Sequence, residues 1–214
     1  MRLVIFGATG WTGRRLVARA LDDGHWVRAF VRDSGKAEEV GLPTRDKNLS
    51  LFEGDVRDAP AVRDAVGDRD AVLSALGPTD GDDDLLTVAA RHIVDAMEGG
   101  EVSRLVSLIG AGVSMPDDPT SLGRTIMRGA LRLFGRSLLE DAEEHARIIR
   151  SSDLKWTLVR PPRMTTGPAT ENYQSGYLAP GPTASISRAD VAAFMVEVLD
   201  EGRYIREAPM VVSV

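Results

Sequence analysis

The sequence predicts an α/β fold: a doubly wound parallel sheet of the Rossmann type, in a single domain that spans residues 1–214. Three observations predict it. Short apolar runs alternate with amphipathic helical segments, the first run ends in a glycine-rich turn, and no internal repeat or linker marks a second domain. Because strand–helix–strand connections are right-handed, this alternation is expected to give one parallel sheet with helices on both faces.

The predicted strands are short apolar runs of the length that buried strands have. They are Leu3–Phe6, Trp26–Val31, Leu49–Phe52, Ala71–Ala75, Leu105–Ile109, Trp156–Val159 and Met210–Val214. The first run ends at Gly7, and glycine is typical of the turns that leave a strand. The runs lack strict alternation of polar and apolar residues, which favours strands buried on both faces.

The predicted helices show apolar residues at a spacing of three or four. They are Arg14–Leu21, Asp82–Met97 and Ser187–Leu199, together with a long helical region over 121–152 that is expected to break near Gly135. Three aspartates open the second of these helices, where the helix dipole favours acidic residues. Residues 163–187 are rich in Pro and Gly, so we expect a small irregular C-terminal lobe on the substrate side of the domain.

Composition excludes several classes of function. The 214 residues carry a net charge of −6 without a basic block, so we expect no binding to nucleic acid or to an anionic membrane. The absence of cysteine excludes disulfides, thiolate metal sites and a cysteine nucleophile, and the three histidines have no metal-ligand spacing. The opening apolar run is too short for a signal peptide, which predicts a cytoplasmic protein.

The strongest motif is the turn between the first strand and the first helix, which reads GATGWTG over residues 7–13. Gly7 allows a tight turn, Gly10 lets the backbone approach a pyrophosphate, and Gly13 lets the helix pack closely on the sheet. The start of the helix adds free N–H groups and a partial positive charge. A glycine-rich turn can also exist without a ligand, but this position favours a dinucleotide site.

The second motif follows the second strand and indicates which dinucleotide is bound. A site specific for NAD has an acid here that binds the ribose 2′-hydroxyl, whereas an Arg accommodates the 2′-phosphate of NADP. Arg32 is the first side chain after the strand, with Ser34 and Lys36 close behind it. Asp33 is the competing candidate, because its charge could repel a phosphate. We predict NADP(H) as the cofactor.

Two further segments lie at the ends of predicted strands. Asp55, in Gly-Asp-Val, could accept a hydrogen bond from the amino group of adenine, although Gly-Asp is also an ordinary turn. Residues 74–78, Ser-Ala-Leu-Gly-Pro, are mostly small and end the fourth strand, where a bound ligand needs close approach to the backbone.

Taken together, these segments resemble the atypical short-chain dehydrogenase/reductase superfamily, in its NmrA-like, flavin-reductase-like (biliverdin reductase B-like) branch. The resemblance covers nearly the whole chain. It rests on IFGATGWTG, FVRDSGK, GDV, DAVLSALGP, ARHIVDAM, LKWTLVRPPRMTTGPAT and SISRADVAAFMVEVL, in that order.

The resemblance implies a cofactor site made of five groups of residues. These are Thr9, Gly10, Trp11, Thr12 and Gly13 for the pyrophosphate; Arg32, Ser34 and Lys36 for the 2′-phosphate; Asp55 and Val56 for adenine; Leu76 and Gly77 for the ribose on the nicotinamide side; and Pro161, Pro162 and Arg163 near the nicotinamide. It further implies a planar small-molecule acceptor of the flavin or quinone class.

The chain departs from the superfamily that it resembles at the positions that carry catalysis there. No tyrosine has a lysine four residues later, so the Tyr–Lys pair is absent, and Gly110 and Arg163 replace a Ser and a His of the branch. His145 lies in a charged helical turn, where we expect a surface or half-buried side chain. The catalytic residues therefore stay open. The expected activity is NADPH-dependent hydride transfer, and the alternative is a non-catalytic redox sensor that binds NADP(H).

Overall fold

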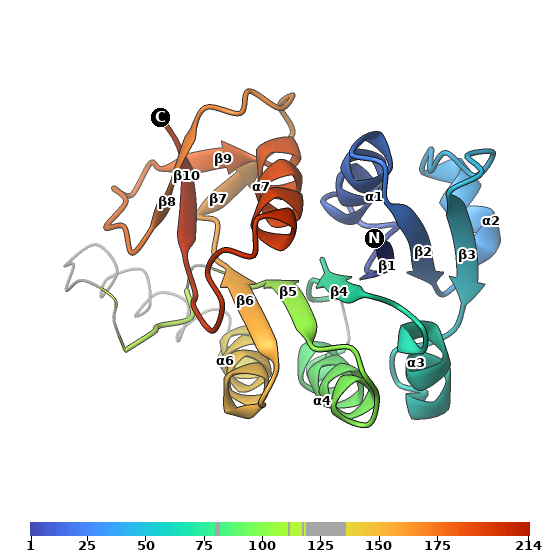
Figure 1. Ribbon diagram of the computed structural model, residues 1–214. Coiled ribbons are helices and arrows are strands. Elements are labelled where there is room, and N and C mark those ends of the chain that lie inside the picture. The colour runs from blue at the N-terminus through green and yellow to red at the C-terminus, as the bar shows by residue number, and fades with distance from the viewer. Residues whose placement is uncertain (80–81, 111, 117, 119–135) are drawn as a thin grey trace.

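The central sheet of the computed structural model has six parallel strands in the order β3-β2-β1-β4-β5-β6 (Figure 1). The structure describes residues 1–79, 82–110, 112–116, 118 and 136–214. The six strands are β1 (Arg2–Phe6), β2 (Trp26–Val31), β3 (Leu49–Glu53), β4 (Ala71–Ser74), β5 (Arg104–Leu108) and β6 (Lys155–Val159). This order is that of the doubly wound dinucleotide-binding fold, so the predicted fold class is confirmed.

Helices cover both faces of the sheet (Figure 1). One face carries α1 (Gly13–Asp22) and α7 (Arg188–Asp200), the other carries α3 (Ala59–Val66), α4 (Leu85–Glu98) and α6 (Arg136–Ser151), and α2 (Ser34–Glu39) follows β2. Alternate residues of each strand enter two separate cores. In β1, Leu3 and Ile5 pack toward α1 and α7, whereas Val4 and Phe6 pack toward α3 and α4. Burial on both faces explains the nearly continuous apolar character of the strands.

Residues 163–187 are more regular than their composition predicts. They contain β7 (Arg163–Thr165), β8 (Tyr173–Gly176) and β9 (Ser185–Ser187). β7 pairs with β9 in parallel, and β8 pairs antiparallel with β10 (Met210–Ser213) from the end of the chain. Strands this short give no measurable periodicity, and their partners are distant in sequence, so the expectation of an irregular lobe was wrong.

The long helical region predicted over 121–152 is described only in its second part, as α6. The expected break near Gly135 lies outside the described residues. No helix in the described ranges is both long and apolar enough to cross a lipid bilayer.

The helix predicted over Asp82–Met97 begins three residues later than expected, and a distant residue caps it. The N–H groups of Leu86 and Thr87 donate to the carboxylate of Asp141, on α6, at 3.0 and 2.8 Å. Two of the three aspartates expected at this helix start bind Arg57 instead. The negative charge at the start of α4 thus comes mainly from α6, which fixes the two helices to each other.

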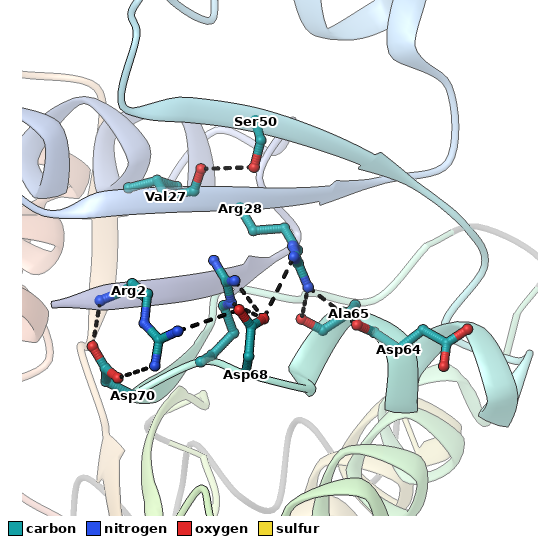
Figure 2. Close-up of polar contacts among 9 residues, drawn as sticks. Arg2, Val27, Arg28, Ser50, Asp64, Ala65, Asp68 and Asp70 are labelled. Atoms are coloured by element: carbon teal, nitrogen blue, oxygen red, sulfur yellow. Dashed lines mark hydrogen bonds and ion pairs between the residues drawn. The ribbon is translucent and has the colours of Figure 1, made fainter.

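Polar contacts close the amino end of the sheet (Figure 2). Arg2 donates from its backbone N–H and from its guanidinium to Asp70, at 2.6 and 3.0 Å, and these contacts lower the pKa of the Asp70 carboxyl. Arg28 donates to the carbonyls of Asp64 and Ala65, at 3.1 and 2.9 Å, where α3 ends. These contacts fix α3 and the turn after it to β1 and β2, so the opposite, carboxyl end of the sheet is left for a ligand.

Candidate functional site

A cavity of about 610 Å³ opens at the carboxyl ends of the parallel strands. Its walls include residues that follow β1, β2, β4, β5 and β6, and it therefore spans the point between β1 and β4 where the strand order reverses. Ligands of doubly wound sheets bind at this point, and the volume lies within the usual range for small-molecule and cofactor sites.

Most of the residues that the sequence singled out line this cavity. They are Gly7, Thr9, Gly10, Trp11, Thr12, Arg32, Val56, Leu76, Gly77, Pro161 and Pro162. The structure does not place five others in the wall, which are Gly13, Ser34, Lys36, Asp55 and Arg163. The carboxylate of Asp55 accepts the backbone N–H of Arg57 at 2.9 Å, as in an ordinary Asx turn.

The three glycines of the first turn serve different needs. Gly7 has φ = +73°, which an L side chain rarely adopts. A Cβ at Gly13 would lie 1.9 Å from the carbonyl oxygen of Gly7, so this residue must be glycine for α1 to pack on β1. A Cβ at Gly10 would lie 3.2 Å from the same oxygen and otherwise project into open space. The fold therefore constrains Gly10 less than it constrains Gly7 or Gly13.

The start of α1 presents unpaired N–H groups to the cavity. In the turn, the N–H of Gly10 donates to Gly7 and that of Arg14 donates to Gly10, both at 3.0 Å. The N–H groups of Trp11, Thr12 and Gly13 donate to no other described residue, and no side chain caps the helix. Together with the helix dipole they form a site for an anion, and the pyrophosphate of a dinucleotide fits it.

The two charged residues that follow β2, Arg32 and Asp33, have different surroundings. Asp33 caps α2, and its Oδ1 accepts the N–H groups of Gly35 and Lys36 at 2.8 and 3.3 Å. Arg32 is exposed and lines the cavity. Ser34 donates its hydroxyl to Glu53 at 2.6 Å, so this hydroxyl is already engaged. Of the residues expected at a 2′-phosphate, Arg32 alone faces the cavity.

Open space lies beside two glycines at the other half of the cavity. Gly77, after β4, and Gly110, after β5, both line the wall, and a Cβ at either would meet no atom within 4 Å. Pro161 and Pro162, after β6, lie in the same wall. A flat ring can therefore approach the backbone closely at the ends of β4 and β5.

A buried ion pair holds the wall behind these prolines. Arg160, which is fully buried, donates to both carboxylate oxygens of Asp118 at 2.6 and 2.9 Å. The same guanidinium donates to the carbonyls of Ala208 and Val113 at 2.7 and 3.3 Å. Arg160 thus ties the end of β6 both to the cavity wall at Val113 and to the C-terminal segment.

His145 lines the cavity and is 2% exposed, contrary to the expected surface or half-buried position. Its Nδ1 lies 3.0 Å from the carbonyl oxygen of Leu86 and its Nε2 lies 3.1 Å from Oγ of Ser107. Burial lowers the pKa of His145, so the ring is neutral at neutral pH, with Nδ1–H donating to Leu86. The spacing of Asp141, His145 and Ile149 on one face of α6 is the signal that could have predicted burial.

Residues 7–202 match a protein family described as NAD(P)H-binding. The chain is 27% identical over 224 residues to the uncharacterized protein YwnB of Bacillus subtilis, and the match covers 100% of this chain and 99% of that protein. It is 32% identical over 213 residues to an uncharacterized chloroplastic protein of Arabidopsis thaliana, covering 92% of this chain and 71% of the relative.

Solved structures share the fold. The anaerobilin reductase ChuY of Escherichia coli O157:H7 superimposes with a TM-score of 0.80 at 21% identity, covering 100% of this chain and 97% of that one. A candidate NADH-flavin reductase from Streptococcus pneumoniae superimposes with a TM-score of 0.76 at 23% identity, covering 100% of both chains. At these identities the likeness is one of fold.

Proposed function

The chain belongs to the NAD(P)H-binding family, and on that premise we propose that it is an NADPH-dependent reductase that transfers hydride to a flavin-like or quinone-like acceptor. The observation that carries this proposal is the extent of the cavity. It runs from Arg32, after β2, past the glycine turn to Pro161 and Pro162, after β6. That extent accommodates the adenosine end of a dinucleotide at one side and its reactive ring beside an acceptor at the other.

A bound nicotinamide dinucleotide supplies the hydride, and the protein supplies binding and orientation. In this proposal the N–H groups at the start of α1 bind the pyrophosphate and Arg32 binds the 2′-phosphate. Leu76 and Gly77 lie beside the second ribose, and the paired prolines form the wall behind the nicotinamide. The mostly apolar lining excludes water and holds two flat rings in contact.

The preference for NADPH over NADH rests on Arg32. Asp33 is the residue that could instead select NADH, but its carboxylate is engaged at the start of α2. Arg32 lines the cavity, and a guanidinium there can form a charge-assisted contact with a phosphate.

We predict that Arg32→Ala weakens NADPH binding about 10- to 100-fold, because a charge-assisted contact contributes roughly 1.5–3 kcal/mol. NADH has no 2′-phosphate, so its affinity should change little. Isothermal titration calorimetry with both cofactors measures this. Arg147→Ala is the matched control, since this exposed arginine on α6 lies outside the cavity wall, and it should bind both cofactors normally. Equal losses for NADPH and NADH in Arg32→Ala would contradict the assignment.

The shape and lining of the cavity favour a planar acceptor. Gly77 and Gly110 leave open space for a ring, and Leu108, Ile109 and Met164 contribute apolar surface to the same walls. The printed names of two proteins with the same fold, an anaerobilin reductase and a candidate NADH-flavin reductase, support this class of acceptor.

We expect NADPH oxidation with at least one member of a panel of FMN, FAD, riboflavin, quinones and redox dyes. The rate should vary little between about pH 6 and 9, because Arg stays protonated in this range and burial lowers the pKa of His145, which favours its neutral form. Steady-state absorbance of NADPH, measured against each acceptor, tests both statements. A steep limb in this range would show that a titrating side chain acts in the reaction.

The alternative function is a redox sensor that binds NADP(H) without turnover. The observation that favours it is the lack of any Tyr, Lys, Asp or Glu among the described residues that line the cavity. The nitrogens of His145 are both engaged as well. If no acceptor in the panel oxidises NADPH above background, while NADP⁺ and NADPH bind with clearly different affinities, the sensor explains the site better than the reductase.

A further inference from the structure

Arg188, the first residue of α7, lines the cavity on the side that faces the glycine turn. Its Nη1 donates to the carbonyl oxygen of Met164 at 3.2 Å. Met164 also contacts the first turn, since its Sδ lies 3.8 Å from Oγ1 of Thr12. Arg188 and the start of α1 therefore meet at one stretch of the wall. A guanidinium has five N–H donors, so the contact with Met164 leaves others free for a ligand.

A second arginine lies close to the first. Arg15, on α1, donates from Nη1 to the carbonyl oxygen of Trp11 at 2.6 Å. Burial lowers the pKa of Arg15, and the charges of Arg14 and Arg188 lower it further, which indicates that these guanidinium groups repel one another. Among the described residues, neither Arg15 nor Arg188 forms an ion pair with a carboxylate.

Like charges gathered at a cavity wall cost free energy unless an anion lies among them. The bonds that Arg15 and Arg188 make are to neutral carbonyls, which leave this repulsion in place. Trp11 and Thr12, whose N–H groups are unpaired, line the same cavity as Arg188. Acidic residues are also absent from the first turn of α1. The two guanidinium groups and the unpaired N–H groups thus favour an anion from outside the chain.

We propose that Arg188 is a positioning residue for the dinucleotide and binds its pyrophosphate from the α7 side, opposite the N–H groups of α1. This inference rests on the proposed function, because it takes the anion to be that of a nicotinamide dinucleotide. NADH and NADPH share the pyrophosphate. Arg188 is therefore expected to raise the affinity for both, whereas Arg32 raises it for NADPH alone.

The test measures dissociation constants of NADPH and NADH for Arg188→Ala, Arg188→Lys and Arg32→Ala by isothermal titration calorimetry. Arg188→Ala should weaken both cofactors by a similar factor, about 10- to 100-fold, because a charge-assisted contact is lost in each. Arg188→Lys keeps the charge and should recover much of that affinity. Arg147→Ala, which removes an exposed arginine on α6, is the matched control and should bind both cofactors normally.

Two outcomes of the Arg188→Ala titrations would overturn the inference and leave the proposed function standing. Unchanged binding of both cofactors by Arg188→Ala excludes the contact, and a loss confined to NADPH would mean that Arg188 binds the 2′-phosphate. Unchanged cofactor binding with a raised KM for FMN, but not for riboflavin, would place Arg188 at the acceptor. A wild-type protein that binds neither cofactor would instead refute the proposed function itself, and this inference with it. Circular dichroism melts of each variant separate loss of binding from loss of fold.

Discussion

Gly10→Val is expected to fold normally and to lose its dinucleotide altogether. The backbone at Gly10 has an ordinary φ, and a Cβ there meets a single atom of the turn, at 3.2 Å. The fold can therefore accept a side chain at this position. Gly10 lines the cavity, and in the proposed binding mode a side chain there would occupy the space in which the backbone approaches the pyrophosphate. Calorimetric titration with NADPH, run beside far-UV circular dichroism, measures the two properties separately.

Gly13→Ala, only three residues away, is the contrasting control. Its new Cβ would lie 1.9 Å from the carbonyl oxygen of Gly7 and 2.7 Å from the carbonyl carbon, both backbone atoms that cannot rotate away. The turn must open or α1 must shift, at a cost of about 3 kcal/mol or more. A large fall in melting temperature is expected here and none for Gly10→Val. Normal NADPH binding by Gly10→Val would show that the glycines serve packing alone.

The central sheet could be predicted because its signals are local. Each strand is a short apolar run between turn residues, and right-handed crossovers then leave few arrangements for alternating strands and helices. The glycine turn is local at Gly13, which Gly7 and Ala8 constrain, whereas Gly7 is also constrained by the distant backbone of Ala75 and Leu76. Structure that depends on residues close together in the sequence can be predicted from such patterns.

Contacts between distant segments could not be predicted in the same way. The cap of α4 comes from Asp141, which is 55 residues beyond the N–H of Leu86 that it accepts. The aspartates that precede α4 looked like its caps, yet two of them bind Arg57. His145 is buried for a related reason, because its partners lie on α4 and β5. In each case the local sequence was compatible with more than one set of hydrogen-bond partners.

The cation on the α7 side of the site illustrates a further limit. The sequence drew attention to Arg163, directly after the paired prolines, but β7 begins there and Arg163 is exposed outside the cavity wall. The next residue, Met164, lines the cavity, because successive side chains of a strand point to opposite faces. Arg188, the first residue of α7, lines the cavity instead. A segment expected to be irregular offered no means of deciding which side chain faces the ligand.

The buried pair of Arg160 and Asp118 is expected to have the largest effect on stability. Arg160→Met would remove the guanidinium that donates to both oxygens of the buried Asp118 carboxylate, and Asp118→Leu would remove that carboxylate from the buried guanidinium. Removing one member of a buried pair costs about 3–5 kcal/mol, a large part of the total stability of a typical domain. Urea unfolding followed by circular dichroism measures each change in the free energy of unfolding.

The double variant Arg160→Met with Asp118→Leu distinguishes the contribution of the ion pair to stability from that of the surrounding hydrogen bonds. Both buried charges are then removed together, so the double change should cost clearly less than the two single changes added together. It should not restore full stability, because the carbonyls of Val113 and Ala208 lose the donor that Arg160 provided. Arg147→Ala, which breaks an exposed pair with Glu144, should leave the free energy of unfolding nearly unchanged. Strict additivity of the two single changes would mean that the buried charges do not stabilise each other, and that Arg160 acts only through its carbonyl contacts.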